Sequence, residues 1–471
     1  MNSRDHSAQL AASEKRAGTA RVPGPGAHSL PAVFLGIWRD RLGLMTRLAE
    51  EYGDVVRFKM GPKTLYYFNH PDHAKHILAD QHDNYHRGIG LLQARRALGD
   101  GLLTTDGAAW RTQRAAVQPV FNRDHTNRYA SAIVDETSRM VDRWRTSSTD
   151  GPVDLAAEMT TLTLAVLGRT LIPEGIPDRN SLGHAFEAVQ DQAMFEMVTL
   201  GSVPHWLPTQ RNRRFRWARR QIDEIVSEVL GATQTQDGTL VSRLSAAYQN
   251  TTDPRQRHRT LRDALATLLL AGHETTSSTL TWAFHLLAER PDVVQRMRAE
   301  ISDAAGDRPL APADVRALRY TTMVVQETMR LFPPVWILPR RAVASDRIGG
   351  VHIPAGADVI VCPYTLHRHQ AFWDRPTDFD PDRFDPQAGH GRHRFAYIPF
   401  GAGPRHCVGS NLGMLEATLV AAMVVRDFDL VPAADHPPHP LPMLSLKARD
   451  GLPMHLVPHG SGRGTKTSPQ A

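Results

Sequence analysis

One stretch of the sequence, Arg259 to Arg290, constrains the fold more than any other, because it is the longest uninterrupted helical candidate and Pro291 ends it. As a helix rising ~1.5 Å per residue it would extend ~48 Å, enough to cross a whole domain. Its middle, Ala264 to Ala271, is apolar on nearly every side, which is typical of a buried helix. The sequence therefore predicts a fold organised around one long central helix.

The remaining text is mainly helical, with a few short strands, so we expect an α+β fold with small β-sheets. No linker separates two cores, and we expect one domain over residues 23–458 between disordered tails at 1–22 and 459–471. The other expected elements are a hairpin of Val55–Met60 and Thr64–Phe68 turning at Gly61-Pro62, a Gly-rich loop from Arg87 to Gly101, a helix from near Ala108, helix ends and loop over Thr233–Thr260, strands at Val351–Ile353 and Val359–Cys362, and a helix over Leu412–Arg426.

Composition excludes several classes of protein. Lys and Arg exceed Asp and Glu by 55 to 49 over 471 residues, and no dense basic tract indicates nucleic-acid binding. Two cysteines cannot build a disulfide framework, which favours a reducing compartment. The polar N-terminus carries no signal core, and the apolar stretch Leu30 to Trp38 is about half the length of a membrane span. We expect a cytoplasmic monomer without a membrane anchor.

The most informative segment for chemistry is Phe400-Gly401-Ala402-Gly403-Pro404-Arg405-His406-Cys407-Val408-Gly409. Its glycines let the backbone turn tightly and approach a flat cofactor. Cys407 stands just before a helix, where backbone N–H groups favour thiolate over thiol. Arg405 could pair with a cofactor carboxylate. The alternative is that Cys407 is an inert buried cysteine in a Gly-rich turn. Cys362 lies in an apolar strand, and we interpret it as a small hydrophobic residue.

This segment resembles the F-x-x-G-x-R-x-C-x-G heme loop of the cytochrome P-450 family at every fixed position. The resemblance covers roughly Pro23 to Pro458 in element order. It implies one triangular domain with heme b between the central helix and the helix that follows the cysteine. Cys407 is then the axial ligand of the iron, with Phe400, Gly401 and Gly409 around the cofactor.

A second motif, Glu327-Thr328-Met329-Arg330, places an acid and a base on one helix face. Alone, such a pair is usually a solvated salt bridge. In this context it resembles the family's E-x-x-R motif, and Phe379 to Phe384 resembles the segment that supplies a second arginine, Arg383. The resemblance implies a structural cluster in which Arg330 and Arg383 both grip the Glu327 carboxylate.

A third motif, Ala271-Gly272-His273-Glu274-Thr275-Thr276, interrupts the long helix. A threonine hydroxyl can bond the carbonyl four residues back and bend a helix, here at Ala271. Ordinary packing of a Thr-rich buried helix is the alternative. The string resembles the family's A-G-x-[D/E]-T-[T/S] pattern, which implies that Ala271 lies against the heme, that Thr275 positions protons and that Glu274 helps to relay them.

Further cofactor contacts follow from the resemblance. Trp110 and Arg114 resemble a W-x-x-x-R motif in which both residues contact a heme propionate. Arg341 resembles another propionate-binding arginine, although its neighbour Arg340 leaves that assignment open by one residue. A surface arginine is the alternative at each position.

The family likeness implies a monooxygenase that inserts one oxygen atom of O2 into a hydrophobic molecule by hydroxylation or epoxidation. No nucleotide-binding loop follows a strand in this sequence, so electrons from NAD(P)H are expected through a separate ferredoxin and ferredoxin reductase. A basic surface near the cysteine would suit an acidic ferredoxin. Its members would be Arg111, Arg114, Arg392, Arg394 and Arg405.

By family position, a set of mostly apolar residues is expected to line the substrate pocket, although each could equally be plain core. They are Ile89, Leu91, Leu92, Phe195, Val198, Leu268, Val335, Ile337, Met443 and Leu444. A terpenoid, polyketide or fatty-acid-like secondary metabolite would fit them, with a lean towards a terpenoid, and Arg87 is the one charge that could grip a substrate carboxylate. Two alternatives stay open: a heme-thiolate peroxygenase or isomerase that needs no electron donor, and a non-enzymatic heme- or zinc-binding protein, for which the histidines lack finger spacing.

Overall fold

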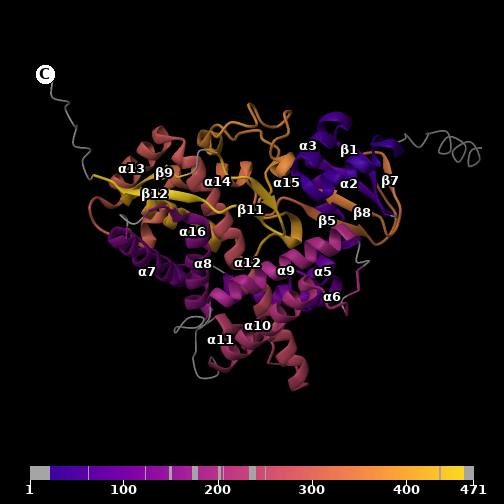
Figure 1. Cartoon of the computed structure of the whole chain (residues 1–471), viewed down its shortest axis with the longest axis horizontal. Helices are drawn as coiled ribbons and strands as arrows, with labels where there is room; N and C mark the ends of the chain where they lie inside the picture. Colours follow the sequence, from indigo (N-terminus) through magenta and orange to yellow (C-terminus); the bar gives the residue numbers. More distant parts are fainter. Residues whose placement is uncertain are drawn as a thin grey trace, which may run out of the picture.

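A computed structural model describes residues 22–61, 63–121, 123–147, 151–171, 179–199, 203–204, 206–232, 240–249, 251–433 and 436–460. The molecule is mainly helical with small sheets (Figure 1). The helices are α2 (Leu30–Arg39), α3 (Arg41–Tyr52), α4 (Pro71–Lys75), α5 (Leu91–Leu98), α6 (Gly107–Val117), α7 (Arg123–Ser147), α8 (Leu155–Leu171), α9 (Arg179–Thr199), α10 (Gln210–Ala232), α11 (Leu240–Ala247), α12 (Pro254–Ala288), α13 (Pro291–Ala305), α14 (Arg319–Leu331), α15 (Pro363–Leu366) and α16 (Ser410–Asp427).

The strands form one larger sheet and three small ones. The larger sheet has the order β1-β2-β8-β5-β3, in which only β2 and β8 run parallel. The small sheets are β4-β12-β9, β10-β11 and β6-β7. The strands are β1 (Val55–Met60), β2 (Lys63–Phe68), β3 (Tyr85–Arg87), β4 (Val153–Asp154), β5 (Leu338–Ala342), β6 (Asp346–Ile348), β7 (Val351–Ile353), β8 (Asp358–Val361), β9 (Phe428–Pro432), β10 (Pro440–Pro442), β11 (Leu446–Ala448) and β12 (Pro453–Pro458).

The central helix predicted from the sequence is α12. It lies in the middle of the molecule. In Figure 1, α9 is beside it, α10 and α11 are below it, the larger sheet and α2–α3 are at one side, and α7, α13 and α16 are at the other. Nearly every side chain from Leu261 to Leu287 is buried, as the all-round apolar pattern predicts. The helix begins at Pro254 rather than Arg259, because the Asp253 side chain accepts the Arg255 N–H at 2.9 Å and Pro254 suits the first helical position.

Two further expectations need correction. The segment from Arg87 to Gly101 is not simply a loop, because α5 occupies its middle. Leu91–Leu98 is rich in good helix formers, while Gly90 (φ +93°) and Gly99 (φ +74°) turn the chain at its two ends. Between Thr233 and Thr260 the structure places α11 as well as the first turns of α12; residues 233–239 and 250 lie outside the described residues.

The predicted hairpin, the strands near Val351 and Val359 and the helix after the cysteine are confirmed within one or two residues. The largest apolar core packs α16 against α7, α8, α12, α13 and α14, so the helix that follows Cys407 is held on several sides. Among the described residues, no helix combines the length and apolar character that crossing a bilayer requires. Residues 1–21 and 461–471 of the expected tails, and Pro62 of the hairpin turn, lie outside the described residues.

Candidate active site around Cys407

The cysteine loop is a tightly closed turn ahead of α16. The Cys407 N–H donates to the Phe400 carbonyl at 3.0 Å, which closes the loop on itself. Gly401 and Gly403 have φ values of +70° and +68°, which L side chains adopt only with strain. A Cβ on Gly403 would also overlap the Leu78 carbonyl oxygen. The glycines are therefore required by the backbone, as the sequence predicts.

Cys407 has an accessible side chain, although protein surrounds the loop. Burial raises the pKa of its thiol, and a hydrogen bond from the Gly409 N–H together with the positive charge of Arg114 only partly offsets that rise. The backbone N–H group thus favours thiolate, as expected, but its effect on the pKa is smaller than that of burial. A metal ion at the sulfur would deprotonate it outright, since a coordinated thiol loses its proton.

The central helix packs directly against α16. A Cβ on Gly413 of α16 would lie 3.9 Å from the Thr276 hydroxyl of α12. On α12, Ala271 is exposed and Thr275 is partly exposed, although most of the surrounding helix is buried. These two residues are one turn apart, so they present one accessible strip. The strip is where a cofactor or a substrate can reach the helix.

Thr275 bonds backwards as predicted, since its hydroxyl donates to the Ala271 carbonyl at 2.9 Å. Thr276 does the same to Gly272 at 3.3 Å. However, α12 continues as an α-helix through the whole motif, so the predicted interruption is wrong. Hydroxyl bonds of this kind leave the helix intact because they share a carbonyl already used by the backbone.

Glu274 is held in a buried ionic network. Its carboxylate accepts from Ser445 Oγ at 2.7 Å, and Lys447 Nζ lies 2.9 Å away. His273 Nε2 is 3.7 Å distant, while its Nδ1 bonds the Leu269 carbonyl at 2.6 Å. Burial raises the pKa of Glu274, but Lys447, His273 and Ser445 outweigh it, so the net pKa is lowered. Burial also lowers the pKa of His273, which is therefore neutral at pH 7.

Three buried arginines gather beside the cysteine loop, and we call Arg87, Arg340 and Arg405 the arginine cluster. Arg87 and Arg340 are opposite each other in the β3–β5 ladder. Among the described residues, the cluster has one hydrogen-bonded carboxylate, Asp106, which accepts from the Arg405 guanidinium and from the Arg87 backbone N–H. Burial lowers the pKa of all three arginines, and their mutual repulsion adds to the effect for Arg87 and Arg340. Arg87 Nε also lacks a hydrogen-bond partner.

Trp110 belongs to this region, because the Arg405 guanidinium lies over its ring at 4.4 Å. Arg114 instead turns to the cysteine loop: its Nη1 donates to the His406 carbonyl at 2.6 Å, and its Nε donates to Gln118. The structure thus places Trp110 with the arginine cluster, while Arg114 fixes the loop and lowers the pKa of Cys407. The propionate contact expected of Arg114 stays a prediction.

The choice between Arg340 and Arg341 follows from strand alternation, because neighbouring residues of β5 point to opposite faces of the sheet. Arg341 pairs with Asp358 at 3.2 Å, beside Lys63 on the same carboxylate. Arg340 is buried with Arg87 and Arg405. The geometry therefore favours Arg340 over Arg341 as the arginine that faces the cluster, and the propionate contact itself stays a prediction. Arg87 likewise belongs to the arginine cluster rather than standing alone as a grip for a substrate carboxylate.

These residues fit a heme. The arginine cluster holds more positive than negative charge in a buried place, and two carboxylates of a cofactor would balance it. The accessible sulfur of Cys407 follows Arg405 by two residues, on a loop whose glycines allow a flat group to approach. On α12, which packs against α16, the exposed Ala271 leaves room for such a group to meet the helix.

The Glu327–Arg330 pair is fully buried. Arg330 grips the carboxylate with Nε at 2.6 Å and Nη2 at 2.7 Å, and it also donates to the carbonyls of His367, Pro376 and Asp378. Arg383 approaches Glu327 at 3.4 Å without a hydrogen bond from its Nε. Its other nitrogens donate to the Asp374 and Arg375 carbonyls. The cluster is structural as expected, but only one guanidinium fork grips the carboxylate.

The expected pocket residues divide into groups. Ile89, Val198 and Ile337 belong to one core cluster with Trp336, and Leu268 and Leu444 belong to another. Leu92 is 36% exposed, and the Phe195 ring is covered by the Arg211 guanidinium at 4.5 Å. Leu92 and Phe195 therefore do not have the surroundings of an enclosed pocket. The other three, Leu91, Val335 and Met443, are partly exposed.

Several residues of the site are absent from the sequence motifs. Trp336 donates its indole N–H to the Met443 carbonyl at 2.7 Å and so ties two expected pocket segments together. The two charged networks also include Asp106, Ser445 and Lys447. Each of these pairs with Arg405 or Glu274, a partner at least 171 residues away in the sequence. No local pattern indicates such contacts. A buried Glu274 in need of a cation is the one signal that could have prompted a search for Lys447.

Comparisons with known proteins agree with this geometry. The profile of the family described as Cytochrome P450 matches residues 23–452. Cyclooctatin synthase of Streptomyces melanosporofaciens is 33% identical over 92% of this chain and 94% of its own length. Cyclooctat-9-en-7-ol 5-monooxygenase of the same organism is 30% identical (87% and 89%), and pentalenene oxygenase of Streptomyces avermitilis is 28% identical (95% and 98%). With its cysteine loop, its central helix and nearly its whole length accounted for, this chain belongs to the cytochrome P450 family and is a monooxygenase.

Proposed function

We propose that this protein inserts one oxygen atom of O2 into a hydrophobic terpenoid, with heme b bound through Cys407. The observation that carries the proposal is the accessible sulfur of Cys407 next to a buried cluster with excess positive charge. The three relatives named above support the substrate class, because their names refer to cyclooctatin, cyclooctat-9-en-7-ol and pentalenene.

When bound, the heme supplies the activation of dioxygen, and a thiolate ligand favours O–O cleavage. The chain's own residues hold it. Cys407 binds the iron, the Gly409 N–H donates to the sulfur, and Arg114 fixes the loop through the His406 carbonyl. The arginine cluster would bind the two propionates, and Trp110 stacks against Arg405 of that cluster. Ala271 would offer the cofactor a small, exposed side chain on α12.

Proton supply is assigned to Thr275 and Glu274. The Thr275 hydroxyl donates to the Ala271 carbonyl, which leaves its oxygen lone pairs free to accept from water on the accessible strip. Glu274 is ionised and bound to Lys447 and Ser445. Glu274 would relay a proton from solvent to Thr275 when its carboxylate exchanges Lys447 for water.

Substrate binding is assigned to apolar residues of two core clusters. Ile89, Val198 and Ile337 pack with Trp336, and Leu268 with Leu444 lies on the other cluster. Such walls recognise an apolar molecule mainly by excluding water, with few polar groups to orient it. This composition agrees with a terpenoid hydrocarbon or alcohol.

Electrons are proposed to come from NAD(P)H through a separate ferredoxin and its reductase. Of the five arginines expected at the docking surface, Arg111 and Arg394 are exposed. Arg111 pairs with Asp83 at 3.1 Å, and Arg392 stacks on Trp373 at 4.2 Å. The basic surface is therefore smaller than the sequence predicts, and salt should weaken docking only moderately.

The test is a reduced carbon-monoxide difference spectrum of the purified protein, compared with Cys407→Ser. Thiolate ligation gives the wild type a band position that the serine variant loses. Turnover of terpene alcohols is then measured with a ferredoxin system and, separately, with hydrogen peroxide alone. Oxidation with peroxide but never with ferredoxin would assign the chain to the peroxygenases, and an unchanged spectrum in Cys407→Ser would reject the proposal.

A further inference from the structure

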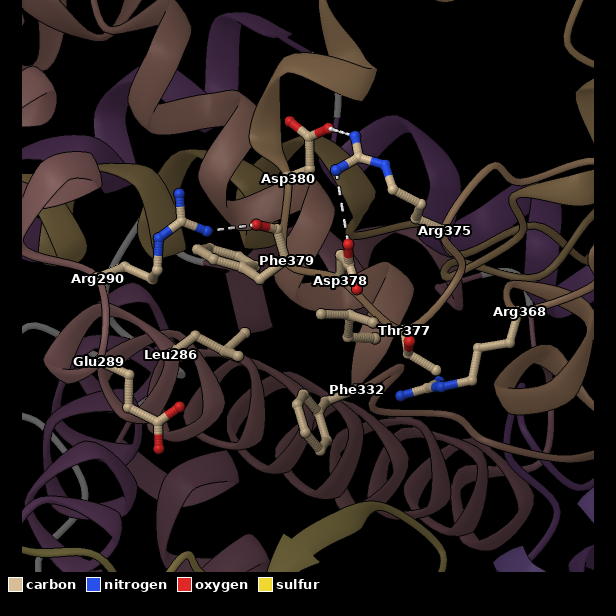
Figure 2. A pocket seen from close by; sticks show the side chains of 11 residues that line it. Leu286, Glu289, Arg290, Phe332, Arg368, Arg375, Thr377, Asp378, Phe379 and Asp380 are labelled. Atoms are coloured by element: carbon tan, nitrogen blue, oxygen red, sulfur yellow. Dashed lines mark hydrogen bonds and ion pairs between the residues drawn. The ribbon is translucent and has the colours of Figure 1, made fainter.

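A second cleft lies away from the arginine cluster and the cysteine loop, and none of the expected site residues lines it. It has a volume of about 660 Å³ and opens between the C-terminal ends of α12 and α14 and the segment that follows α15 (Figure 2). Apolar side chains form part of its wall: Leu286, Leu331, Phe332 and Phe379. The Phe332 ring is itself fixed, because it stacks on Trp282 at a centroid distance of 4.1 Å.

Two of the three arginines that line the cleft are neutralised. Arg290 holds Asp292 at 2.7 Å and donates to the Phe379 carbonyl. Arg375 lies within 3.5 Å of the carboxylates of Asp374, Asp378 and Asp380. Both bonds that Figure 2 draws from Arg375 end on acidic side chains of the cleft. These charges therefore have no need of a ligand.

Arg368 differs from them. Its guanidinium lies over the Tyr364 ring at 3.9 Å and donates to the Tyr364 carbonyl at 3.1 Å. No carboxylate of the described residues lies within ion-pair distance of it. Burial lowers its pKa to about 10. In Figure 2 the side chain reaches into the cleft towards Phe332. A guanidinium has five N–H donors, so most of those on Arg368 remain available to a ligand.

The rest of the cleft suits an anion with an apolar body. Glu289 lies at the opposite end in Figure 2, with its carboxylate directed away from Arg368. Its side chain is 59% exposed, so solvent screens its charge. Thr377, beside Arg368, is exposed and adds a hydroxyl at the charged end.

We propose that this cleft is a second binding site, distinct from the heme site, for an amphiphilic monoanion whose carboxylate pairs with Arg368 and whose apolar chain lies on Leu286, Phe332 and Phe379. A bidentate guanidinium–carboxylate pair is strong where water is partly excluded. The apolar wall adds affinity in proportion to the area that it covers. The wall from Pro376 to Asp380 is held by Arg330 and Glu327, so the cleft is preformed.

The test is calorimetric titration of the heme-loaded protein with octanoate, with 4-phenylimidazole present at saturation to keep the heme pocket closed to the probe. We expect one site that binds octanoate and barely binds 1-octanol, because the neutral alcohol cannot pair with Arg368. Arg368→Gln should weaken octanoate binding at least about tenfold, the loss of one charge-assisted contact. Arg290→Gln is the matched control, since Arg290 lines the same cleft but is already paired with Asp292, an exposed carboxylate outside the lining, and the change should alter affinity by less than about twofold.

Thr377→Glu is a second variant, which tests the same contact without replacing the Arg368 side chain. Thr377 is exposed, so the change is tolerated, and the new carboxylate would occupy Arg368 and abolish octanoate binding. Equal binding of octanoate and octanol, or octanoate binding unchanged in both Arg368→Gln and Thr377→Glu, would overturn the proposal. Neither outcome depends on the carbon-monoxide spectrum or on turnover, so this site and the proposed oxygenase function fail separately.

Discussion

Two buried groups of arginines in this molecule have opposite electrostatic balance. Around Glu327, the guanidinium of Arg330 is fully buried and donates to one carboxylate and three carbonyls. In the arginine cluster, Arg87 and Arg340 are buried and the Arg405 side chain is only 5% exposed, but the three share the single hydrogen-bonded carboxylate of Asp106. The first network is complete within the chain, whereas the second is short of negative charge.

This difference separates a structural network from a binding site. A buried charge without a counter-ion destabilises a fold, so a chain keeps one only where a ligand completes it or function requires it. Glu327 and Arg330 fix the carbonyls of 376–380 and need nothing more. The arginine cluster is complete only with additional anions, which the propionates of a heme would supply. Removing one charge should therefore have opposite consequences in the two places.

The largest effect is expected for Glu327→Gln. It leaves Arg330 as a buried cation without its carboxylate, which typically costs about 3–5 kcal/mol of unfolding free energy. Burial raises the pKa of Glu327, but the bidentate contact with Arg330 keeps the carboxylate ionised at neutral pH. Urea unfolding at pH 7 followed by tryptophan fluorescence measures the loss. Glu289→Gln, at an exposed position near the end of α12, should stay within about 0.5 kcal/mol.

A smaller effect of different kind is expected for Arg340→Gln. The variant relieves repulsion with Arg405, so the unfolding free energy of the heme-free chain should not fall. Heme affinity should fall, because a charge-assisted hydrogen bond to a propionate contributes about 1.5–3 kcal/mol, or roughly ten- to a hundredfold. The rate of heme transfer to an excess of apomyoglobin measures this.

Arg341→Gln is the control for Arg340→Gln. Its side chain lies on the other face of β5 with Asp358, so heme transfer should keep the wild-type rate. If Arg341→Gln releases heme faster and Arg340→Gln does not, the comparison between the two buried groups loses its basis, because the arginine cluster would then have no role in binding the cofactor.

Local patterns were sufficient for the elements that depend on neighbouring residues. The apolar run of α12, the glycines of the cysteine loop and the spacing of Glu327 and Arg330 each determine their own geometry. Boundaries were less predictable where capping decides them: Asp253 and Pro254 start α12 one turn early, and Gly90 and Gly99 bound a helix where a loop was expected.

The charged networks were less predictable because they depend on strand register and on distant segments. Arg340 and Arg341 are equivalent in sequence, and only the pairing of β5 with β3 and β8 shows which one lies beside Arg87. Glu274 was identified from its motif, but Lys447 and Ser445 come from the β10–β11 region far along the chain. That contact changes the interpretation of Glu274, since it holds the carboxylate ionised.

The Glu274–Lys447 pair lies between the two extremes, because the acid is 7% exposed and its cation 27% exposed. Lys447→Met should cost about 1–2 kcal/mol of unfolding free energy at pH 7, less than Glu327→Gln, since solvent can partly replace the lysine.

The pH dependence should change as well. In the wild type the pKa of Glu274 is lowered below 4.5, so its contribution to stability is complete above that pH and is lost as pH falls through the folded value. Without Lys447, burial dominates and raises the pKa, so protonation then stabilises the fold as pH falls. The urea midpoint at pH 5, relative to that at pH 7, should therefore be higher in Lys447→Met than in wild type. Lys63→Met is the matched control, because Asp358 keeps Arg341 when Lys63 is removed. An identical pH dependence in Lys447→Met and wild type would show that Ser445 and His273 hold the charge of Glu274 without the lysine.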